Sequence, residues 1–292
     1  MEKENPNSLT RREFVKATMA GAAGLAVSSF MPVRKVGAQS PIKLGFVSIF
    51  SGRVAMLGET GLRGALLAAD EYNAQGGVLG RKIEIIHRDS AGKIEEAVRI
   101  ARDFVVKDKI DFMLDNSSSR EAFAVKEVSR DLKIITMVVA SETTDLTADP
   151  KIATPYSFRS ARQSIHDCSV AGYYAAKLSK EQGLTRWYSL SPDYAYGHDS
   201  TERFFEFLKK KNPNVEIVGQ LWPKLFEPDY TPHITKILAD KPHAIYSSLW
   251  GGDTVAFIEQ ALMYGLFQQS KFFCINIADY TVLKALKSVP EG

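Results

Sequence analysis

Three consecutive serines stand where polar side chains are well placed to hold a small anionic or amide group. Asn116-Ser117-Ser118-Ser119 follows a predicted strand and precedes a predicted helix. Hydroxyl groups and unpaired N–H groups at the start of a helix form a favourable anion site, so a carboxylate or an amide oxygen could dock there. For any single serine of the run, a role as a helix cap is the better explanation. We interpret the run of three as a binding site.

Four aromatic residues, Phe50, Tyr194, Tyr196 and Trp250, lie just past predicted strand ends and beside Gly or Asp. Most aromatic side chains belong to a core, but this placement favours an aromatic-lined pocket. Covering about 150 Å² of one aromatic at roughly 25 cal/mol/Å² gives at most about 4 kcal/mol, against about 1 kcal/mol for a typical hydrogen bond. The aromatic residues would therefore supply affinity and the serines orientation.

The residue patterns that indicate an enzyme are absent from the sequence. It has no G-x-S-x-G or H-E-x-x-H motif, and no G-x-G-x-x-G or G-x-x-x-x-G-K-[ST] nucleotide loop. We therefore expect a protein that is not an enzyme and that has no cofactor and no metal. Asp193 and Asp253 are the lesser alternative, an acid pair of a hydrolase. The histidines are scattered without metal-like spacing: His87, His166, His198, His233 and His243.

Short apolar runs alternate with longer amphipathic runs from residue 41 to near the end of the chain. The short runs predict strands and the longer runs, with a 3.6-residue period, predict helices. This alternation indicates parallel sheets with helices on both faces, an α/β fold. The predicted strands are residues 42–49, 82–87, 111–114, 134–138, 186–190, 215–221, 244–248 and 272–275. The predicted helices are residues 62–74, 94–106, 121–131, 165–181, 201–210, 230–239 and 254–264, with another near 280–287.

The stretch from residue 149 to 160 interrupts this alternation. It carries Pro150 and Pro155, followed by Tyr156-Ser157-Phe158-Arg159. We interpret it as a crossing between two α/β lobes, each a mostly parallel sheet between helices. The expected N-terminal lobe is residues 41–154 and the expected second lobe is residues 155–292.

The first 38 residues form a separate segment. Thr10-Arg11-Arg12-Glu13-Phe14-Val15-Lys16 resembles the twin-arginine export signal, and an apolar run over residues 17–33 follows it. That run is shorter than the roughly 20 residues that a bilayer span requires. Val36-Gly37-Ala38 supplies small residues for cleavage after Ala38. The sequence thus predicts a protein exported to the periplasm by the twin-arginine translocase.

The net charge and the cysteine content further limit the class of protein that the sequence can encode. The first 38 residues carry six Lys or Arg and three Glu, which accounts for the whole formal net charge of +3. A neutral mature chain argues against nucleic acid as a partner, because phosphate binding needs a basic surface. Cys168 and Cys274 are the only cysteines, and neither has a lipid-attachment context. We expect a soluble, unlipidated protein, and the sequence leaves open whether the two cysteines pair.

The turn after the first predicted strand carries the most specific pattern. Ser48 to Gly58 is followed by Gly61-Leu62-Arg63-Gly64-Ala65, and the helix ends in Glu71-Tyr72-Asn73-Ala74-Gln75-Gly76-Gly77. With Arg88-Asp89-Ser90 after the next strand, the chain resembles the leucine/isoleucine/valine-binding, type I periplasmic binding proteins. The resemblance implies a two-lobed receptor that binds an amino-acid-like or amide-like ligand between its lobes and delivers it to an ABC permease.

The resemblance also implies positions for the ligand. Ala140-Ser141-Glu142-Thr143 stands where the family offers a backbone N–H, a carbonyl and a hydroxyl, so Ala140, Ser141 and Thr143 are expected contacts. Residues 192–197 match the family's D-x-x-Y-G loop, which contains Tyr194 and Tyr196. Trp250 stands where the family places an aromatic against the ligand, and Phe50 is expected across the cleft.

One expected contact departs from the family pattern. Amino-acid receptors hold the ligand ammonium with an acidic side chain in the loop that here reads Asn276-Ile277-Ala278-Asp279. The acidic position falls on Asn276 or, with a shift, on Asp279. If Asn276 is the contact, the ammonium has no charged partner there, and an unpaired buried cation is costly. Amides, ureas and non-amino carboxylates are then as plausible as leucine.

Two further alternatives stay open. A sensing module that signals to a partner protein would share this fold, because function depends on the site and not on the architecture. Receptors of this family also return from the second lobe to the first, whereas this chain ends soon after the helix near residues 280–287. We therefore expect a truncated reading frame or a fragment.

Overall fold

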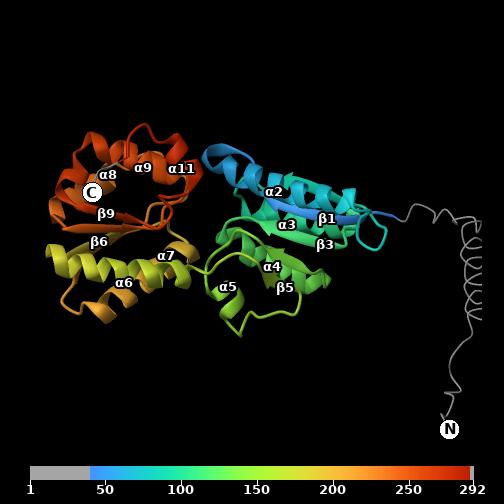
Figure 1. Ribbon diagram of the computed structural model, residues 1–292, viewed down its shortest axis with the longest axis horizontal. Helices are drawn as coiled ribbons and strands as arrows, with labels where there is room; N and C mark the ends of the chain where they lie inside the picture. The colour runs from blue at the N-terminus through green and yellow to red at the C-terminus, as the bar shows by residue number, and fades with distance from the viewer. Residues whose placement is uncertain (1–39, 290–292) are drawn as a thin grey trace, which may run out of the picture. The chain divides into compact units, whose positions relative to one another are not determined.

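The computed structural model describes residues 40–289, so the predicted export residues Arg11, Arg12 and Ala38 lie outside the described part. Two parallel sheets organise these residues, one of strand order β2-β1-β3-β4-β5 and one of order β7-β6-β8-β9 (Figure 1). Both sheets are flanked by helices, which confirms the predicted α/β fold with two lobes.

The first sheet contains β1 (Ile42–Ser48), β2 (Ile83–Asp89), β3 (Phe112–Asn116), β4 (Thr136–Val138) and β5 (Ser157–Arg159). All its strand pairs are parallel: β1 pairs with β2 and β3, and β3 at the centre of the sheet also pairs with β4. The elements between the strands are η1 (Gly52–Val54), α2 (Ala55–Ala74), α3 (Ile94–Asp103), the π-helix η2 (Phe104–Asp108), α4 (Ser119–Leu132) and α5 (Asp145–Ala148).

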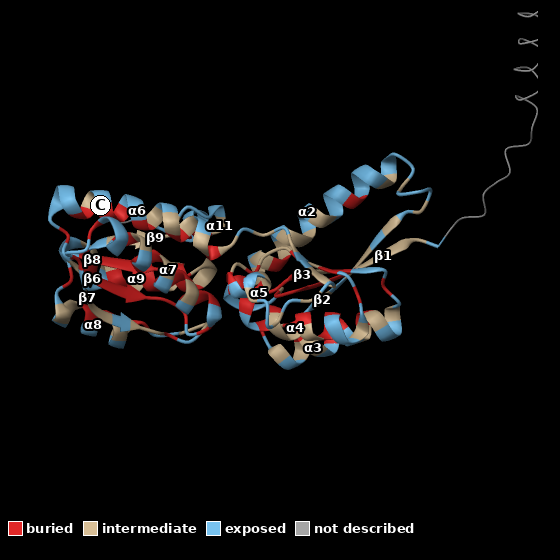
Figure 2. Cartoon of the chain, turned by 90° about the horizontal axis from the view of Figure 1, so that it is seen from below, coloured by how far each residue is buried: buried red, intermediate tan, exposed pale blue. Residues whose placement is uncertain are grey.

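The second sheet contains β6 (Arg186–Leu190), β7 (Glu216–Leu221), β8 (Ala244–Ser247) and β9 (Lys271–Cys274). Every residue of β8 is buried, as expected for a central parallel strand with helices on both faces (Figure 2). The helices are α6 (Ser164–Gln182), α7 (Ala195–Lys211), α8 (Thr231–Asp240), α9 (Gly251–Met263), α10 (Leu266–Gln269) and α11 (Tyr280–Ala285).

Aromatic packing dominates the core of the second lobe. The rings of Phe204 and Tyr246 stack at 4.0 Å between centroids, and Trp187 lies against Phe204 at 5.5 Å. On the opposite face of the sheet, Tyr230 packs edge-on against Phe257. These side chains are fully buried, and each contributes a large share of the apolar area that stabilises the lobe.

All eight predicted strands correspond to observed strands, with ends that agree within two residues. The start of α2 is different, because the helix begins at Ala55 and not at residue 62. Gly58 and Gly61 weakened the helix pattern over the first two turns, because glycine is a poor helix former. Tertiary contacts explain both, since a Cβ on Gly58 would meet the Ile49 carbonyl at 2.5 Å and one on Gly61 would meet the Asn116 side chain at 2.5 Å.

The stretch interpreted as a crossing between lobes contributes β5 to the first sheet, where Ser157, Phe158 and Arg159 pair with β4. A three-residue edge strand flanked by prolines and polar residues has no detectable period, so the sequence pattern missed it. The helix that follows, α6, packs against α7 in the second lobe.

Three other features concern the described residues. None of the helices in residues 40–289 has the length and apolar character that crossing a bilayer requires. The same residues contain no group of three His, Cys, Asp or Glu side chains arranged to hold a metal ion. Cys168 and Cys274 are both free thiols, which answers the question that the sequence left open.

Gly172 allows α6 and α7 to approach closely. A Cβ at this position would lie 2.7 Å from the Phe204 carbonyl oxygen and 2.8 Å from Phe207 Cβ. Replacing Gly172 by Leu must push the two helices apart, so we expect the free energy of unfolding to fall by roughly 1–3 kcal/mol in urea denaturation. Tyr174→Leu, at a 57% exposed position of the same helix, is the control and should change stability far less. Equal effects of the two substitutions would contradict this account of the packing.

Candidate functional site

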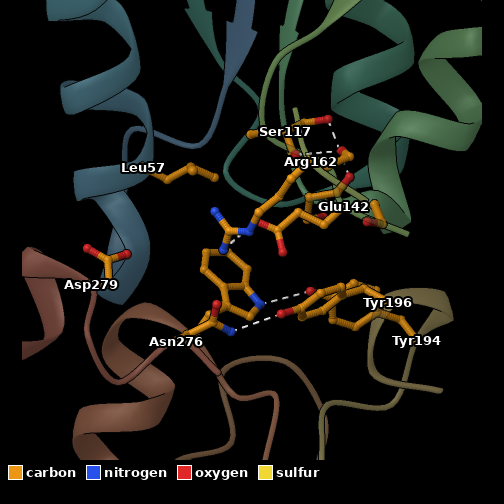
Figure 3. A pocket seen from close by; sticks show the side chains of 13 residues that line it. Leu57, Ser117, Glu142, Arg162, Tyr194, Tyr196, Asn276 and Asp279 are labelled. Carbon is orange, nitrogen blue, oxygen red and sulfur yellow. Dashed lines mark hydrogen bonds and ion pairs between the residues drawn. The ribbon is translucent and has the colours of Figure 1, made fainter. Parts of the chain in front are cut away.

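A cavity of about 160 Å³ lies where loops of both lobes meet (Figure 3). Its walls come from segments that follow β1, β3, β4 and β5 of the first sheet and β6, β8 and β9 of the second, as expected for ligand sites of open α/β sheets. The lining residues are Leu57, Ser117, Ser118, Ser119, Ala140, Ser141, Glu142, Arg162, Tyr194, Tyr196, Trp250, Asn276 and Asp279.

The three serines have different hydrogen bonds. Ser118 is the N-cap of α4, and its hydroxyl and backbone N–H both donate to the Glu121 carboxylate in a capping box. The Ser117 hydroxyl donates to the buried carboxylate of Asp115. The Ser119 hydroxyl accepts from the Thr143 backbone N–H at 3.4 Å, which leaves its hydrogen for another acceptor. The first N–H groups of α4 lack intrahelical acceptors, so this end of the cavity suits an oxygen of a ligand.

In the segment from Ala140 to Thr143, the carbonyl groups of Ser141, Glu142 and Thr143 accept hydrogen bonds from within the protein. Arg159 donates to the Ser141 carbonyl at 2.6 Å and to the Thr143 carbonyl at 2.7 Å. The Ser141 hydroxyl donates to the Ser117 carbonyl at 2.8 Å, which ties this segment to the serine loop. Ala140 and Ser141 line the cavity, whereas Thr143 is fully buried and does not.

Phe50 does not line the cavity either. Its ring packs against Phe46 and His87, and its backbone N–H donates to the Asp89 carboxylate at 2.8 Å. The close approach of Gly58 to the Ile49 carbonyl turns the chain so that Leu57, and not Phe50, reaches the cavity. Sequence reasoning had no signal for Leu57, because one apolar residue among glycines looks like an ordinary loop or helix residue.

The other three aromatic residues form one wall and are joined by hydrogen bonds. The Trp250 indole N–H donates to the Tyr194 hydroxyl at 2.8 Å, and the Tyr194 and Tyr196 ring centroids lie 6.0 Å apart. The Tyr196 hydroxyl accepts from the Asn276 side-chain amide at 2.9 Å. Burial raises the pKa of both tyrosines above its usual range, so this wall is uncharged at neutral pH.

Asn276 and Asp279, between which the sequence could not decide, both line the cavity but differ in their bonds. The Asn276 amide nitrogen donates to the Tyr196 hydroxyl and to the carbonyls of Ser248 and Leu249. Its nitrogen is therefore saturated, and only its carbonyl oxygen remains for a ligand. Asp279 is exposed and caps α11, with its carboxylate accepting from the backbone and hydroxyl of Thr281 at 2.9 Å each.

Two charged residues of the cavity, Glu142 and Arg162, were missed by the sequence analysis. Their side chains face one another in Figure 3, with 3.0 Å between Glu142 Oε1 and an Arg162 guanidinium nitrogen. Arg162 also pairs with Asp167. Burial raises the pKa of Glu142 to about 7, although Arg162 lowers it. A charged residue among small hydroxyl residues at a strand end was a usable signal for Glu142. Arg162 lay between the stretch interpreted as a crossing, residues 149–160, and the next predicted helix, where no pattern marked it.

Asp193 and Asp253, the possible acid pair, do not line this cavity. Asp193 is exposed and pairs with His198 at 2.9 Å. Asp253 is buried, accepts from the Phe226 backbone N–H at 2.8 Å, and lies 3.6 Å from Arg53. The two carboxylates therefore have separate partners.

The buried carboxylate of Asp115 holds the loop of Ser117, Ser118 and Ser119, which we call the serine loop, through Ser117. Asp115 is fully buried, its Oδ1 accepts from the Ser117 N–H and hydroxyl, and its Oδ2 has no hydrogen-bond partner among residues 40–289. Burial raises the pKa of Asp115 to about 7. Between about pH 4 and pH 7 the folded protein thus keeps a proton that the unfolded chain releases, so the stability that this group supports falls as the pH rises through that window.

The substitution Asp115→Asn should remove this part of the pH dependence. Wild type is expected to lose free energy of unfolding between pH 5 and pH 8, and Asp115→Asn to lose less by an amount on the order of 1–3 kcal/mol. Denaturant titrations at pH 5 and pH 8 measure the free energy of unfolding of wild type and of Asp115→Asn. Asp70→Asn, at an exposed position of α2, is the matched control and should follow wild type. If Asp115→Asn also follows wild type, Asp115 does not hold its proton in the folded state.

Comparison with known proteins identifies the family. Residues 41–289 match the family model described as periplasmic binding protein. The chain is 25% identical over 255 residues to the Leu/Ile/Val-binding protein of Escherichia coli K12, a match that covers 87% of this chain and 65% of that protein. It is 27% identical over 232 residues to Leu/Ile/Val-binding protein homolog 7 of Brucella suis, covering 77% of this chain and 56% of that protein.

The same fold occurs in a solved structure, the solute binding protein of an ABC transporter from Rhodopseudomonas palustris BisB5 in complex with 3,4-dihydroxy benzoic acid. That structure superposes with a TM-score of 0.70 at 24% identity and covers 80% of this chain and 61% of that one. The chain therefore belongs to the periplasmic binding protein family, and its similarity to Leu/Ile/Val-binding proteins agrees with the resemblance noted from the sequence. It spans 56% to 65% of the length of the two curated relatives described above.

Proposed function

We propose that the chain is an exported receptor for a small amino-acid-like or amide-like solute, which it delivers to the membrane subunits of an ABC transporter without chemical change. The observation that carries this proposal is the cavity in which loops of both sheets converge, with serine hydroxyls and α4 N–H groups at one end and three aromatic rings at the other. The names of the two relatives agree with an amino-acid-like ligand.

The size of the cavity sets the size of the ligand. A cavity of about 160 Å³ suits a single amino acid or a small aromatic compound. In this arrangement a carboxylate or amide oxygen of the ligand lies at the start of α4, near Ser117, Ser118 and Ser119. Its apolar part lies against Tyr194, Tyr196 and Trp250, while Ala140, Ser141, Asn276 and Asp279 complete the contacts.

A thermal-shift screen of the purified chain from Gln39 onward tests the proposal. The panel contains amino acids, amides, ureas and aromatic carboxylates. A ligand present at 100 times its dissociation constant adds about 2.7 kcal/mol to the free energy of unfolding, so a true ligand raises the melting temperature clearly. If no compound of the panel shifts a cooperative transition, the proposed ligand class is wrong.

Trp250 should contribute strongly to affinity, because its ring is the part of the aromatic wall that comes from the loop after β8. We expect Trp250→Ala to weaken binding of the strongest hit from the screen by tenfold or more, about 1.4 kcal/mol, in calorimetry. Trp222→Ala is the matched control, since Trp222 stacks on His198 and does not line the cavity. Unchanged affinity in folded Trp250→Ala would remove Trp250 from the site.

The export route has its own test in the twin-arginine segment. Replacing both Arg11 and Arg12 by Lys keeps the charge but removes the paired guanidinium groups, and we expect the protein to remain in the cytoplasm. Arg34→Lys, later in the same segment, is the control and should still be exported. Cell fractionation and immunoblotting measure the exported fraction. Normal export of the double variant would exclude the twin-arginine route.

A further inference from the structure

Glu142 has one carboxylate oxygen that the protein leaves without a partner. Its side chain is 18% exposed, and Oε1 pairs with Arg162 at 3.0 Å. Oε2 is buried and has no hydrogen-bond partner among the described residues. Buried polar atoms nearly always have a partner, and an unsatisfied carboxylate oxygen is costly. A ligand atom that donates a hydrogen bond to Oε2 would supply the partner that the protein does not provide.

The charged residues that the structure describes near Glu142 give its Oε2 no hydrogen-bond donor. Arg162 divides its guanidinium between Glu142 and Asp167, and Arg159 uses its N–H groups on the carbonyls of residues 141 and 143 and on a threonine hydroxyl. Asp167 and Asp279 are the other charged groups close enough to act on Glu142, and both are negative. The surroundings of Oε2 thus favour a hydrogen-bond donor or a cation.

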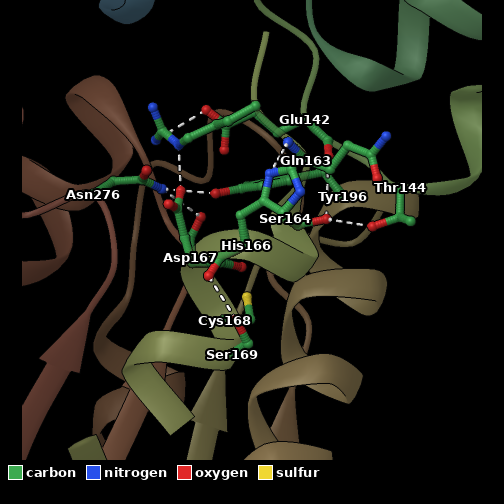
Figure 4. A network of polar contacts seen from close by, with 12 residues as sticks. Glu142, Thr144, Gln163, Ser164, His166, Asp167, Cys168, Ser169, Tyr196 and Asn276 are labelled. Carbon is green, nitrogen blue, oxygen red and sulfur yellow. Dashed lines mark hydrogen bonds and ion pairs between the residues drawn. The ribbon is translucent and has the colours of Figure 1, made fainter. Parts of the chain in front are cut away.

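The backbone around Glu142 fixes where its side chain points. Its own carbonyl accepts from the Ser164 N–H at 2.8 Å, at the start of α6 (Figure 4). The carbonyls on either side of it are both bound by Arg159. Because these three consecutive carbonyls are occupied, the strongest acceptor that this segment offers to the cavity is the Glu142 carboxylate.

The alternative acceptors in the loop after β9 are weaker. The Asn276 side chain is neutral, and its nitrogen is saturated. The Asp279 carboxylate is exposed and is used to cap α11. Water screens an exposed charge of this kind, so it contributes less to selecting a ligand than a buried one.

We infer that Glu142 is the residue that selects the ligand, and that its free oxygen accepts a hydrogen bond from an amino or amide N–H group of that ligand. This inference rests on the proposed receptor function and narrows it to compounds that carry such a donor. A carboxylate without an N–H group would leave the oxygen unsatisfied and would be repelled when Glu142 is ionised.

Paired ligands test the inference. Calorimetry is done with L-leucine and 4-methylpentanoate, with L-phenylalanine and 3-phenylpropanoate, and with benzamide and benzoate. For any pair that binds, wild type should prefer the member that carries N–H by tenfold or more. Glu142→Gln should reduce that preference at least tenfold. Glu96→Gln is the matched control, because Glu96 also pairs with an arginine but lies on α3, outside the cavity.

The same measurements at pH 6 and pH 8 give a second, independent readout. Burial raises the pKa of Glu142 to about 7, so the ionised, accepting form becomes more common as the pH rises through 7. Wild-type affinity for the amine-bearing ligand should therefore increase several-fold from pH 6 to pH 8, and Glu142→Gln should lose this dependence.

The outcomes distinguish a failure of the role of Glu142 from a failure of the proposed receptor function. If wild type binds these compounds but prefers the carboxylates, or if Glu142→Gln keeps the full preference, the role of Glu142 is refuted while the receptor function stands. If wild type binds none of them and the thermal-shift screen has no hit, the proposed function fails and the inference fails with it.

Discussion

The buried carboxylate of Glu121 is the interaction on which the first-lobe half of the cavity depends. One of its oxygens accepts from the Ser90 hydroxyl, and the other accepts from the N–H and hydroxyl of Ser118. The Ser90 N–H in turn donates to the Ser48 carbonyl at 2.8 Å. A single fully buried side chain therefore joins the loops that follow β2 and β3, and Ser90 links them to the end of β1. Burial raises the pKa of Glu121, and the hydrogen bonds from Ser90 and Ser118 partly counteract this rise.

Contacts between the lobes bring the two halves of the cavity together. Arg53 in η1 donates to the carbonyls of Phe226 and Glu227 at 2.6 and 2.9 Å. Nearer the chain crossing, the Thr144 N–H donates to the Asp199 carboxylate at 2.7 Å. Each contact links a loop of the first lobe to the second lobe. These bonds help to hold the aromatic wall and the serine loop at one cavity, because neither lobe contains both groups.

The strands were predictable because each is a short apolar run bounded by polar or Gly-containing turns, and burial on both faces of a parallel sheet leaves that signature. The loops that follow strands were predictable as site regions for a topological reason, since parallel strands place their carboxyl ends at one edge. Ten of the twelve residues expected to bind the ligand therefore line the cavity. Local sequence pattern could not predict two features. One is the turn at Gly58, which brings Leu57 and not Phe50 to the cavity, and the other is the edge strand β5, which positions Arg159.

The arrangement divides recognition between the lobes by chemistry. The first lobe contributes hydroxyls, N–H groups and the Glu142 carboxylate, all held on loops whose carbonyls and caps are satisfied within the protein. The second lobe contributes neutral aromatic rings, whose phenols are kept un-ionised by burial. A ligand that satisfies only one of these surfaces leaves either an unpaired buried carboxylate oxygen or an uncovered aromatic wall. On the proposed function, affinity therefore requires a polar head with donor groups and an apolar body in one small molecule, and the Trp250–Tyr194 and Asn276–Tyr196 hydrogen bonds hold the aromatic wall against which that body would lie.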